Sequence, residues 1–70
     1  MTENERARKV GERLKELRGI RPQTKLAKAL GVSYSGYRNY EAGERIPRDD
    51  IKERIAKYYS LSVSDIFFPE

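Results

Sequence analysis

The hydrophobic pattern at the start of the chain is helical. Between about Glu3 and Arg18 the apolar residues lie three or four positions apart, with charged residues between them: Ala7, Val10, Leu14 and Leu17. This spacing places one apolar stripe along one side of an amphipathic helix. We expect this helix to end near Gly19. Pro22 then suits the first position of the next helix, where its missing N–H costs no hydrogen bond.

The helical period continues through residues 23–42, where one glycine interrupts it. Four apolar residues fall into two pairs, one pair on each of two helical faces: Leu26 with Leu30, and Tyr37 with Tyr40. Gly31, between the pairs, can adopt the left-handed conformation that ends a helix and turns the chain. Ala27 is small enough for a close helix crossing, and Val32 fills the corner. This is the residue pattern of a DNA-binding helix-turn-helix.

Polar residues and glycines mark the ends of the second of these helices. Ser33 is a natural N-cap, because its hydroxyl can accept from a free backbone N–H, and Gly43 ends the helix. Gly36 within the helix is unusual, since glycine costs up to about 1 kcal/mol there relative to alanine. Either it permits close approach to DNA, or it relieves crowding beneath Tyr40.

Two further helices are expected after a loop that contains Pro47. The first begins with two acidic residues at 49–50, and its expected inner face consists of Ile51, Ile55, Tyr58 and Tyr59. The second is short, with Ser62 and Asp65 as a weak capping box and Pro69 closing it. No strand-like alternation appears. The sequence therefore predicts an all-α fold, a compact five-helix bundle that forms a single domain over residues 1–70.

The composition removes several chemistries. The chain has no Cys and no His, so disulfides, thiolate metal sites and the commonest general base are absent. Most carboxylates lie on charge-mixed helical surfaces, so we expect neither an enzyme nor a cofactor, metal or small-molecule ligand. The N-terminal residues are too charged for a signal peptide, and no apolar run approaches membrane-spanning length. A cytoplasmic protein with no membrane partner is the expectation.

The positive charge is concentrated in the middle of the chain. Of 15 basic and 11 acidic residues, the segment 21–48 holds six basic groups and two acids, whereas the remainder is balanced. The basic groups of the segment are Arg21, Lys25, Lys28, Arg38, Arg45 and Arg48. The whole net charge of +4 therefore lies in and around the two-helix motif, which favours a surface that faces phosphates.

Four segments together carry a family resemblance: GERLKELR, QTKLAKALGVS, YRNYEAGERIP and LSVSDIFF. With them the chain resembles, over about residues 10–68, the Cro and repressor-type helix-turn-helix family, also called the XRE family. The resemblance implies the phage-repressor DNA-binding fold. The chain departs from the family pattern at Pro22, where Ser or Thr is usual, and at Tyr34, where short polar residues are frequent.

The resemblance also implies roles for single residues. Gln23 would contact a backbone phosphate and brace the recognition helix, and Ser33 and Arg45 would hold phosphates. Arg18 and Glu41 would form an ion pair. The positions that usually reach base edges in the major groove are Tyr34, Ser35 and Asn39.

The helical step supports that assignment independently. With Tyr37 and Tyr40 facing inward, the outer or flanking surface of the helix presents Tyr34, Ser35, Arg38 and Asn39. Asn can bond adenine bidentately, Arg prefers guanine, and Ser suits either. The roles of two residues stay open. Tyr34 either contacts DNA or covers Pro22 and Gln23. Lys25 either contacts a phosphate or, like Lys28, belongs to a solvated helix face.

The C-terminal third is rich in apolar residues, which predicts self-association. Ten of the eighteen residues from 51 to 68 are apolar. Phe67 and Phe68 point about 100° apart on a helix, so one packs inside and the other joins Tyr58 or Tyr59 in an exposed patch. These four residues form the expected interface of a two-fold homodimer. The alternative is a monomer whose aromatics close its own core.

The sequence therefore predicts sequence-specific binding of double-stranded DNA through the major groove, as a transcriptional repressor of the phage or bacterial type. The alternative is a protein-interaction module, such as an antitoxin-like adaptor, whose helices grip a partner instead of DNA. An RNA-binding role ranks third, because no RNA-module signature is visible.

Overall fold

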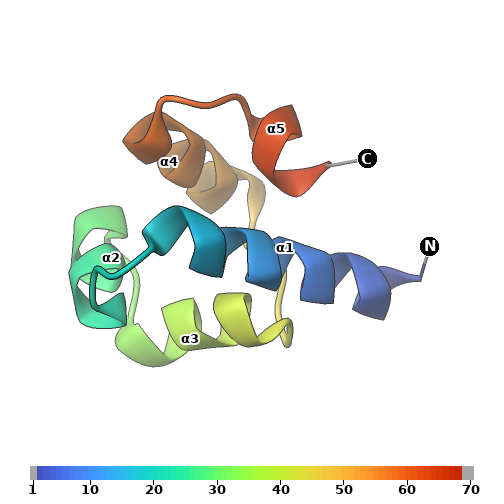
Figure 1. The fold of residues 1–70 in the computed structure, drawn as a ribbon, viewed down its shortest axis with the longest axis horizontal. Helices are drawn as coiled ribbons and strands as arrows, with labels where there is room; N and C mark the ends of the chain where they lie inside the picture. The colour runs from blue at the N-terminus through green and yellow to red at the C-terminus, as the bar shows by residue number, and fades with distance from the viewer. Residues whose placement is uncertain (1, 69–70) are drawn as a thin grey trace.

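Five helices follow one another along the chain, and the first lies between the others (Figure 1). The computed structural model describes residues 2–68, and within that range every regular element is a helix. The helices are α1 (Glu3–Arg18), α2 (Gln23–Leu30), α3 (Tyr34–Ala42), α4 (Asp49–Tyr59) and α5 (Val63–Phe67). The predicted all-α, five-helix architecture is confirmed. Pro69, predicted to close the last helix, lies outside the described residues.

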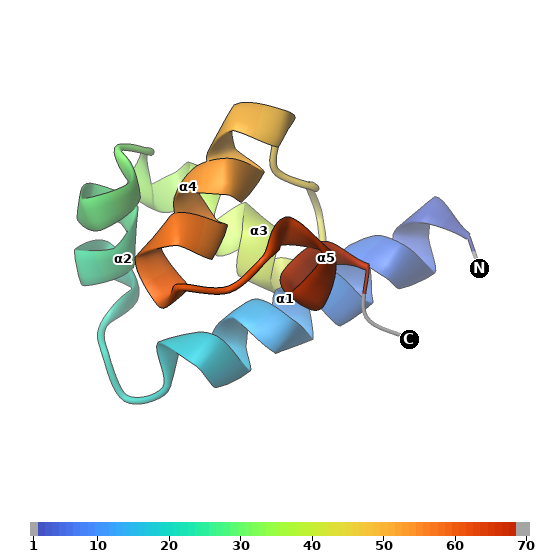
Figure 2. The same cartoon turned by 90° about the horizontal axis from the view of Figure 1, so that it is seen from above.

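The helices are arranged on two sides of α1. In Figure 1, α3 runs below α1, whereas α4 and α5 lie above it. In the view from above, α5 lies in front of α1 and α4 in front of α3 (Figure 2). The outer surface of α3 is therefore directed away from the C-terminal helices.

Most predicted helix ends are confirmed. Gly31 and Gly43 have left-handed backbones (φ 71° and 76°), and each donates its N–H to carbonyls of the preceding turn. The Ser33 hydroxyl accepts from the backbone N–H of Gly36 at 3.0 Å, and α5 begins with a capping box. The prediction for Pro22 is wrong by one position. Pro22 is the extended N-cap of α2, because α2 begins at Gln23.

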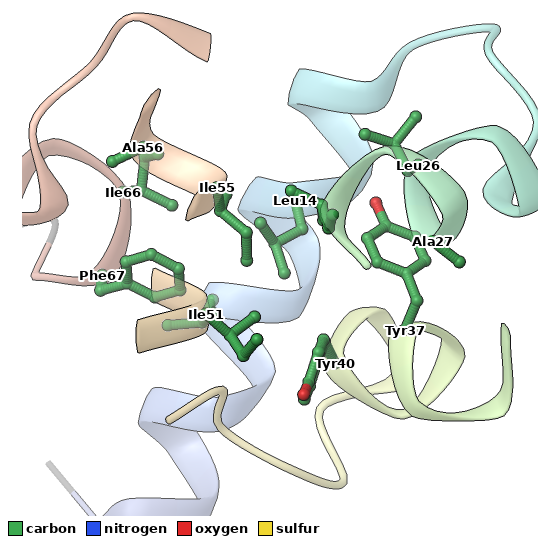
Figure 3. Packing of buried hydrophobic residues seen from close by; sticks show 12 residues of the cluster. Leu14, Leu26, Ala27, Tyr37, Tyr40, Ile51, Ile55, Ala56, Ile66 and Phe67 are labelled. Atoms are coloured by element: carbon green, nitrogen blue, oxygen red, sulfur yellow. The ribbon is translucent and has the colours of Figure 1, made fainter. Parts of the chain in front are cut away.

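The core lies where the apolar sides of all five helices meet (Figure 3). Leu14 of α1 and Ile55 of α4 are fully buried at its centre. The inner face of α4 differs from the prediction, because Ala56 is buried whereas Tyr58 is exposed and Tyr59 is half-buried. The reason is that α4 packs against both α2 and α5, which turns its buried face toward the Ala56 side.

Gly11 allows α1 and α3 to pack closely, a feature that the hydrophobic pattern did not predict. A Cβ atom built at Gly11 would lie 2.8 Å from the Tyr40 carbonyl oxygen and closer still to that of Glu41. Both neighbours are backbone atoms, so they cannot move aside without displacing α3. The glycine therefore sets the position of α3 relative to α1.

Candidate nucleic-acid interface

The outer face of α3 carries the side chains predicted to contact bases. Tyr34, Ser35 and Arg38 are exposed, and Asn39 is half-buried. Tyr37, Tyr40 and Glu41 are buried on the opposite side of the helix. The helical step that places these three inward therefore leaves the four candidates on the outer surface or at its edge.

An open hollow of about 450 Å³ borders this face. It is lined by Lys15, Gln23, Ser35, Arg38, Asn39, Glu41, Ala42 and Glu44. The hollow thus brings three of the four base-contact candidates together with Gln23, the candidate phosphate contact at the start of α2. Tyr34 is not part of the lining and lies beside it on α3.

Three lining residues were missed by the sequence reasoning. Ala42 is exposed on the outer face of α3, and the 100° step from Ser35 and Asn39 could have found it. Lys15 lies in the last turn of α1 and Glu44 follows α3. No local signal in the sequence could have placed Lys15 there, because its position depends on how α1 packs against α3.

A buried carboxylate ties α3 to the two preceding helices. The side chain of Glu41 is only 1% exposed, and Arg18 donates to it twice, from Nε to Oε2 at 2.7 Å and from Nη2 to Oε1 at 3.0 Å. Gln23 Nε2 donates to Oε1 at 2.9 Å, and the Tyr37 hydroxyl donates to Oε2 at 2.5 Å. Arg18 and Glu41 thus form the expected pair. We call these four residues the Glu41 network.

The Glu41 network keeps its carboxylate ionised. Burial raises the pKa of the Glu41 carboxyl, but the hydrogen bonds from Arg18, Tyr37 and Gln23 outweigh it and leave the pKa below its ordinary value. Burial and the bond to Glu41 raise the pKa of the Tyr37 hydroxyl well above its usual range. The network therefore holds one fixed negative charge, matched by Arg18, behind the outer face of α3.

The candidate phosphate contacts differ in how free their donors are. Lys25, Ser33 and Arg45 are exposed. Ser33 uses its hydroxyl oxygen as the α3 cap acceptor, so the hydroxyl proton is left to donate. Gln23 is half-buried, and one N–H of its amide is directed to Glu41. Its second N–H is the remaining side-chain donor for a phosphate.

The basic residues of segment 21–48 do not all lie on one phosphate-facing surface. The Arg21 guanidinium lies 5.8 Å and 5.4 Å from the ring centroids of Tyr58 and Tyr59, on α4. It also donates to the carbonyl oxygens of Arg18 and Leu17, at the end of α1. Arg21 is therefore a structural residue here, and the charge count overstated the basic surface beside α3.

The structure places Tyr34 and Gly36 in surroundings that the sequence did not predict. Tyr34 is 47% exposed, and the Arg38 guanidinium lies 5.5 Å from its ring centroid. A Cβ at Gly36 would lie 2.9 Å from the Ser33 hydroxyl oxygen. Glycine at position 36 thus leaves room for the cap of α3, a reason different from both alternatives considered.

The candidate dimer residues do not form one patch. Phe67 is 1% exposed and belongs to the core, so it is not available for a partner. Phe68 is 50% exposed and lies beside Arg6 and Lys52. Tyr58 lies instead beside Arg21, past the other end of α1, which is about 24 Å long. The expectation that the outer phenylalanine joins a tyrosine in one patch is therefore wrong.

Comparison with known proteins identifies the arrangement. A family model described as Helix-turn-helix, of the XRE type, matches residues 12–66, from α1 through most of α5. The chain belongs to the Cro and repressor-type helix-turn-helix family. Searches of curated proteins and of solved structures found no significant match.

Membership assigns roles to the helices of the motif. The family is one of DNA-binding regulators, and in helix-turn-helix proteins generally the second helix of the motif is the recognition helix. The predicted motif spans α2 and α3, which are joined at Gly31. Across residues 2–68 of this helix-turn-helix protein, no group of His, Cys, Asp or Glu side chains has the arrangement of a metal site. No helix within the same residues has the length and apolar character needed to cross a membrane.

Proposed function

We propose that the protein is a sequence-specific transcriptional repressor that inserts α3 into the major groove of double-stranded DNA. The observation that carries the proposal is the gathering of Ser35, Arg38 and Asn39 on an outward face of α3 beside Gln23. Each side chain offers the donors or acceptors that base edges require. The proposed base contacts are Tyr34, Ser35, Arg38 and Asn39. The proposed phosphate contacts are Gln23, Lys25, Ser33 and Arg45.

The way α3 is held supports this role. Base recognition needs side chains fixed to a fraction of an ångström, which a rigid helix provides better than a loop. The Glu41 network fastens the inner side of α3 to α1 and α2, and Gly11 permits its close packing on α1. The outer side is left without covering helices, because α4 and α5 lie on the opposite, core side of α3 (Figures 1 and 2).

Fluorescence anisotropy with a labelled random-sequence duplex at rising salt tests the DNA contact. We expect binding at low salt that weakens steeply as salt rises, because each phosphate contact releases counterions. Lys25→Gln should lower the slope of log affinity against log salt by about 0.9. Lys57→Gln is the matched control, since Lys57 is an exposed lysine in the last turn of α4 and is not among the proposed DNA contacts. No binding to the duplex at low salt would contradict the proposal and favour the protein-interaction alternative.

We also propose that two copies bind one operator. A single α3 reads only a few base pairs, and pairing doubles that over half-sites about one helical turn apart. Phe68 is exposed and directly follows α5. Because α5 lies on the side of α1 opposite α3 (Figure 1), a contact there leaves the proposed DNA-facing side free. Analytical ultracentrifugation with a duplex selected from a random pool should show two protomers per site. One protomer per site, with no palindrome among the selected sequences, would contradict pairing.

A further inference from the structure

Tyr34 and Arg38 form a cation–π pair on the proposed recognition helix. They lie one helical turn apart on α3, and the Arg38 guanidinium carbon is 5.5 Å from the Tyr34 ring centroid. Both side chains are exposed. Among residues 2–68, the Arg38 side chain has no hydrogen bond or ion pair. Its N–H donors are therefore open to a ligand.

This pair differs from the other aromatic–cation contacts of the protein. Arg21 lies against rings on α4, and Lys52 lies against the ring of Phe67, so both contacts join separate elements. The Tyr34–Arg38 contact lies within α3 and connects no two elements. An exposed contact within one helix contributes little to the fold. Its effect is on the side chains themselves, because the ring restricts where the long arginine side chain lies.

The N–H donors of the restricted Arg38 guanidinium suit one particular base. Arg38 lines the hollow together with Ser35 and Asn39, so it reaches from the Tyr34 ring to the base-facing side of α3. The donors of a guanidinium lie in its own plane, and a ring face occupied by the guanidinium does not consume them. Two such donors match the O6 and N7 acceptors of guanine, the commonest specific arginine contact in the major groove.

The ring itself has a target next to that guanine. Base pairs along one strand are 3.4 Å apart, so groups separated by 5.5 Å reach the same or neighbouring base pairs. The apolar feature of the major groove is the 5-methyl group of thymine. We propose that Tyr34 and Arg38 act as one recognition unit for a guanine with a neighbouring thymine, with Arg38 on the guanine and the Tyr34 ring on the methyl group.

This inference rests on the proposed function, and the experiment separates the two. A duplex is first selected from a random pool with the wild-type protein. Its affinity is then measured by anisotropy after two single-atom or single-group changes in the DNA. Deoxyuridine in place of thymidine removes only the methyl group, and 7-deazaguanine removes only the N7 acceptor.

For the wild type we expect each DNA change to weaken binding by about tenfold, the lower part of the range for a good base contact. Tyr34→Ala should bind the thymidine and deoxyuridine duplexes equally, and Arg38→Ala should not distinguish guanine from 7-deazaguanine. Tyr34→Ala should also reduce discrimination at the guanine, because the ring no longer restricts Arg38. Tyr34→Phe keeps the ring and should behave like the wild type. Circular dichroism confirms that each variant is folded.

Three outcomes overturn the inference. The first is a selected sequence without a guanine beside a thymine. The second is wild-type protein that binds the deoxyuridine duplex as tightly as the thymidine duplex. The third is a Tyr34→Ala variant that binds every duplex more weakly by the same factor, which would make Tyr34 a backbone contact. Wild-type protein that enriches no sequence at all contradicts the proposed function itself. The failure of the recognition unit is therefore distinguishable from the failure of DNA binding.

Discussion

Replacing Glu41 by alanine should be among the most destabilising single changes in this chain. The substitution removes four hydrogen bonds at once and leaves Arg18, Tyr37 and Gln23 without their shared acceptor. Breaking a buried pair by removing one partner costs about 3–5 kcal/mol. Arg18 is 19% exposed and still donates to the Arg21 carbonyl oxygen, so water relieves part of its loss. We therefore expect a cost near the lower limit, about 3 kcal/mol.

That loss is large compared with the stability of such a domain. At about 0.05–0.15 kcal/mol per residue, a chain of 70 residues has about 4–10 kcal/mol in total. Urea unfolding followed by far-UV circular dichroism should show the midpoint of Glu41→Ala lowered by about 1–3 M. Glu53→Ala is the matched control, because Glu53 is an exposed carboxylate on α4, and its cost should stay within about 0.5 kcal/mol.

Arg18→Ala completes the test. It strands a carboxylate that is 1% exposed, so its cost should be at least that of Glu41→Ala. The double variant should lose less than the sum of the two single variants, because neither partner is then left alone. Equal urea midpoints for wild type, Arg18→Ala and Glu41→Ala would refute the reasoning.

Three further predictions concern the ionisation of Glu41, two buried tyrosine hydroxyl groups and two glycines. Lowering the pH below the ordinary carboxyl pKa of about 4.3 should destabilise the wild type. The folded-state pKa of Glu41 is lowered, so the stabilisation that Glu41 contributes is present above that value and is lost below it. Urea midpoints plotted against pH should therefore be flatter for Glu41→Gln than for the wild type, and parallel curves would contradict this. Tyr59→Phe should leave stability unchanged or raise it, since the Tyr59 hydroxyl oxygen is buried without a hydrogen-bond partner among the described residues. Tyr37→Phe removes a hydrogen bond to Glu41 and should cost about 1–3 kcal/mol. Thermal melts compare the two variants directly, and a larger loss for Tyr59→Phe would be contrary to the structure. Gly11→Ala should destabilise the protein by about 1–3 kcal/mol, because the added methyl group clashes with the α3 backbone. Gly36→Ala should cost less, because the nearest neighbour of Gly36 is the rotatable Ser33 side chain. The reverse order in urea melts would show that Gly11 does not set the α1–α3 packing.

The helices of this fold were predictable because their signals are local. The spacing of Leu26, Leu30, Tyr37 and Tyr40 defines two faces, and Gly31 and Gly43 end their helices with positive φ angles. The outward position of Ser35 and Asn39 follows from the same period. These features need only the chain within one or two turns.

The remaining features depend on how the helices pack, which the local pattern does not contain. Arg21 was counted in the basic segment that favours a phosphate-facing surface, and its aromatic neighbours on α4 could not be found from the sequence. Lys15 enters the hollow only because α1 ends beside α3. Phe67 and Phe68 were known to point apart, but the sequence did not show which of them is buried. Family resemblance supplied the pairing of Arg18 with Glu41, whereas the added bonds of Gln23 and Tyr37 required the structure.

The most direct test of the account is the effect of Asn39→Ala on sequence preference. The measurement is the affinity of the variant for the duplex selected by the wild type and for every single-base replacement of that duplex. Alanine keeps the Asn39 carbonyl oxygen that accepts from the N–H groups of Gly43 and Glu44, so the end of α3 is preserved. Asn4→Ala, at an exposed position of α1, is the control.

If α3 reads bases, Asn39→Ala weakens the selected duplex by about 1–3 kcal/mol and removes the preference at one base pair, while Asn4→Ala changes neither. If Asn39→Ala instead weakens all duplexes equally, or leaves the selected duplex unaffected, the account of α3 as the base-reading element is contradicted at Asn39.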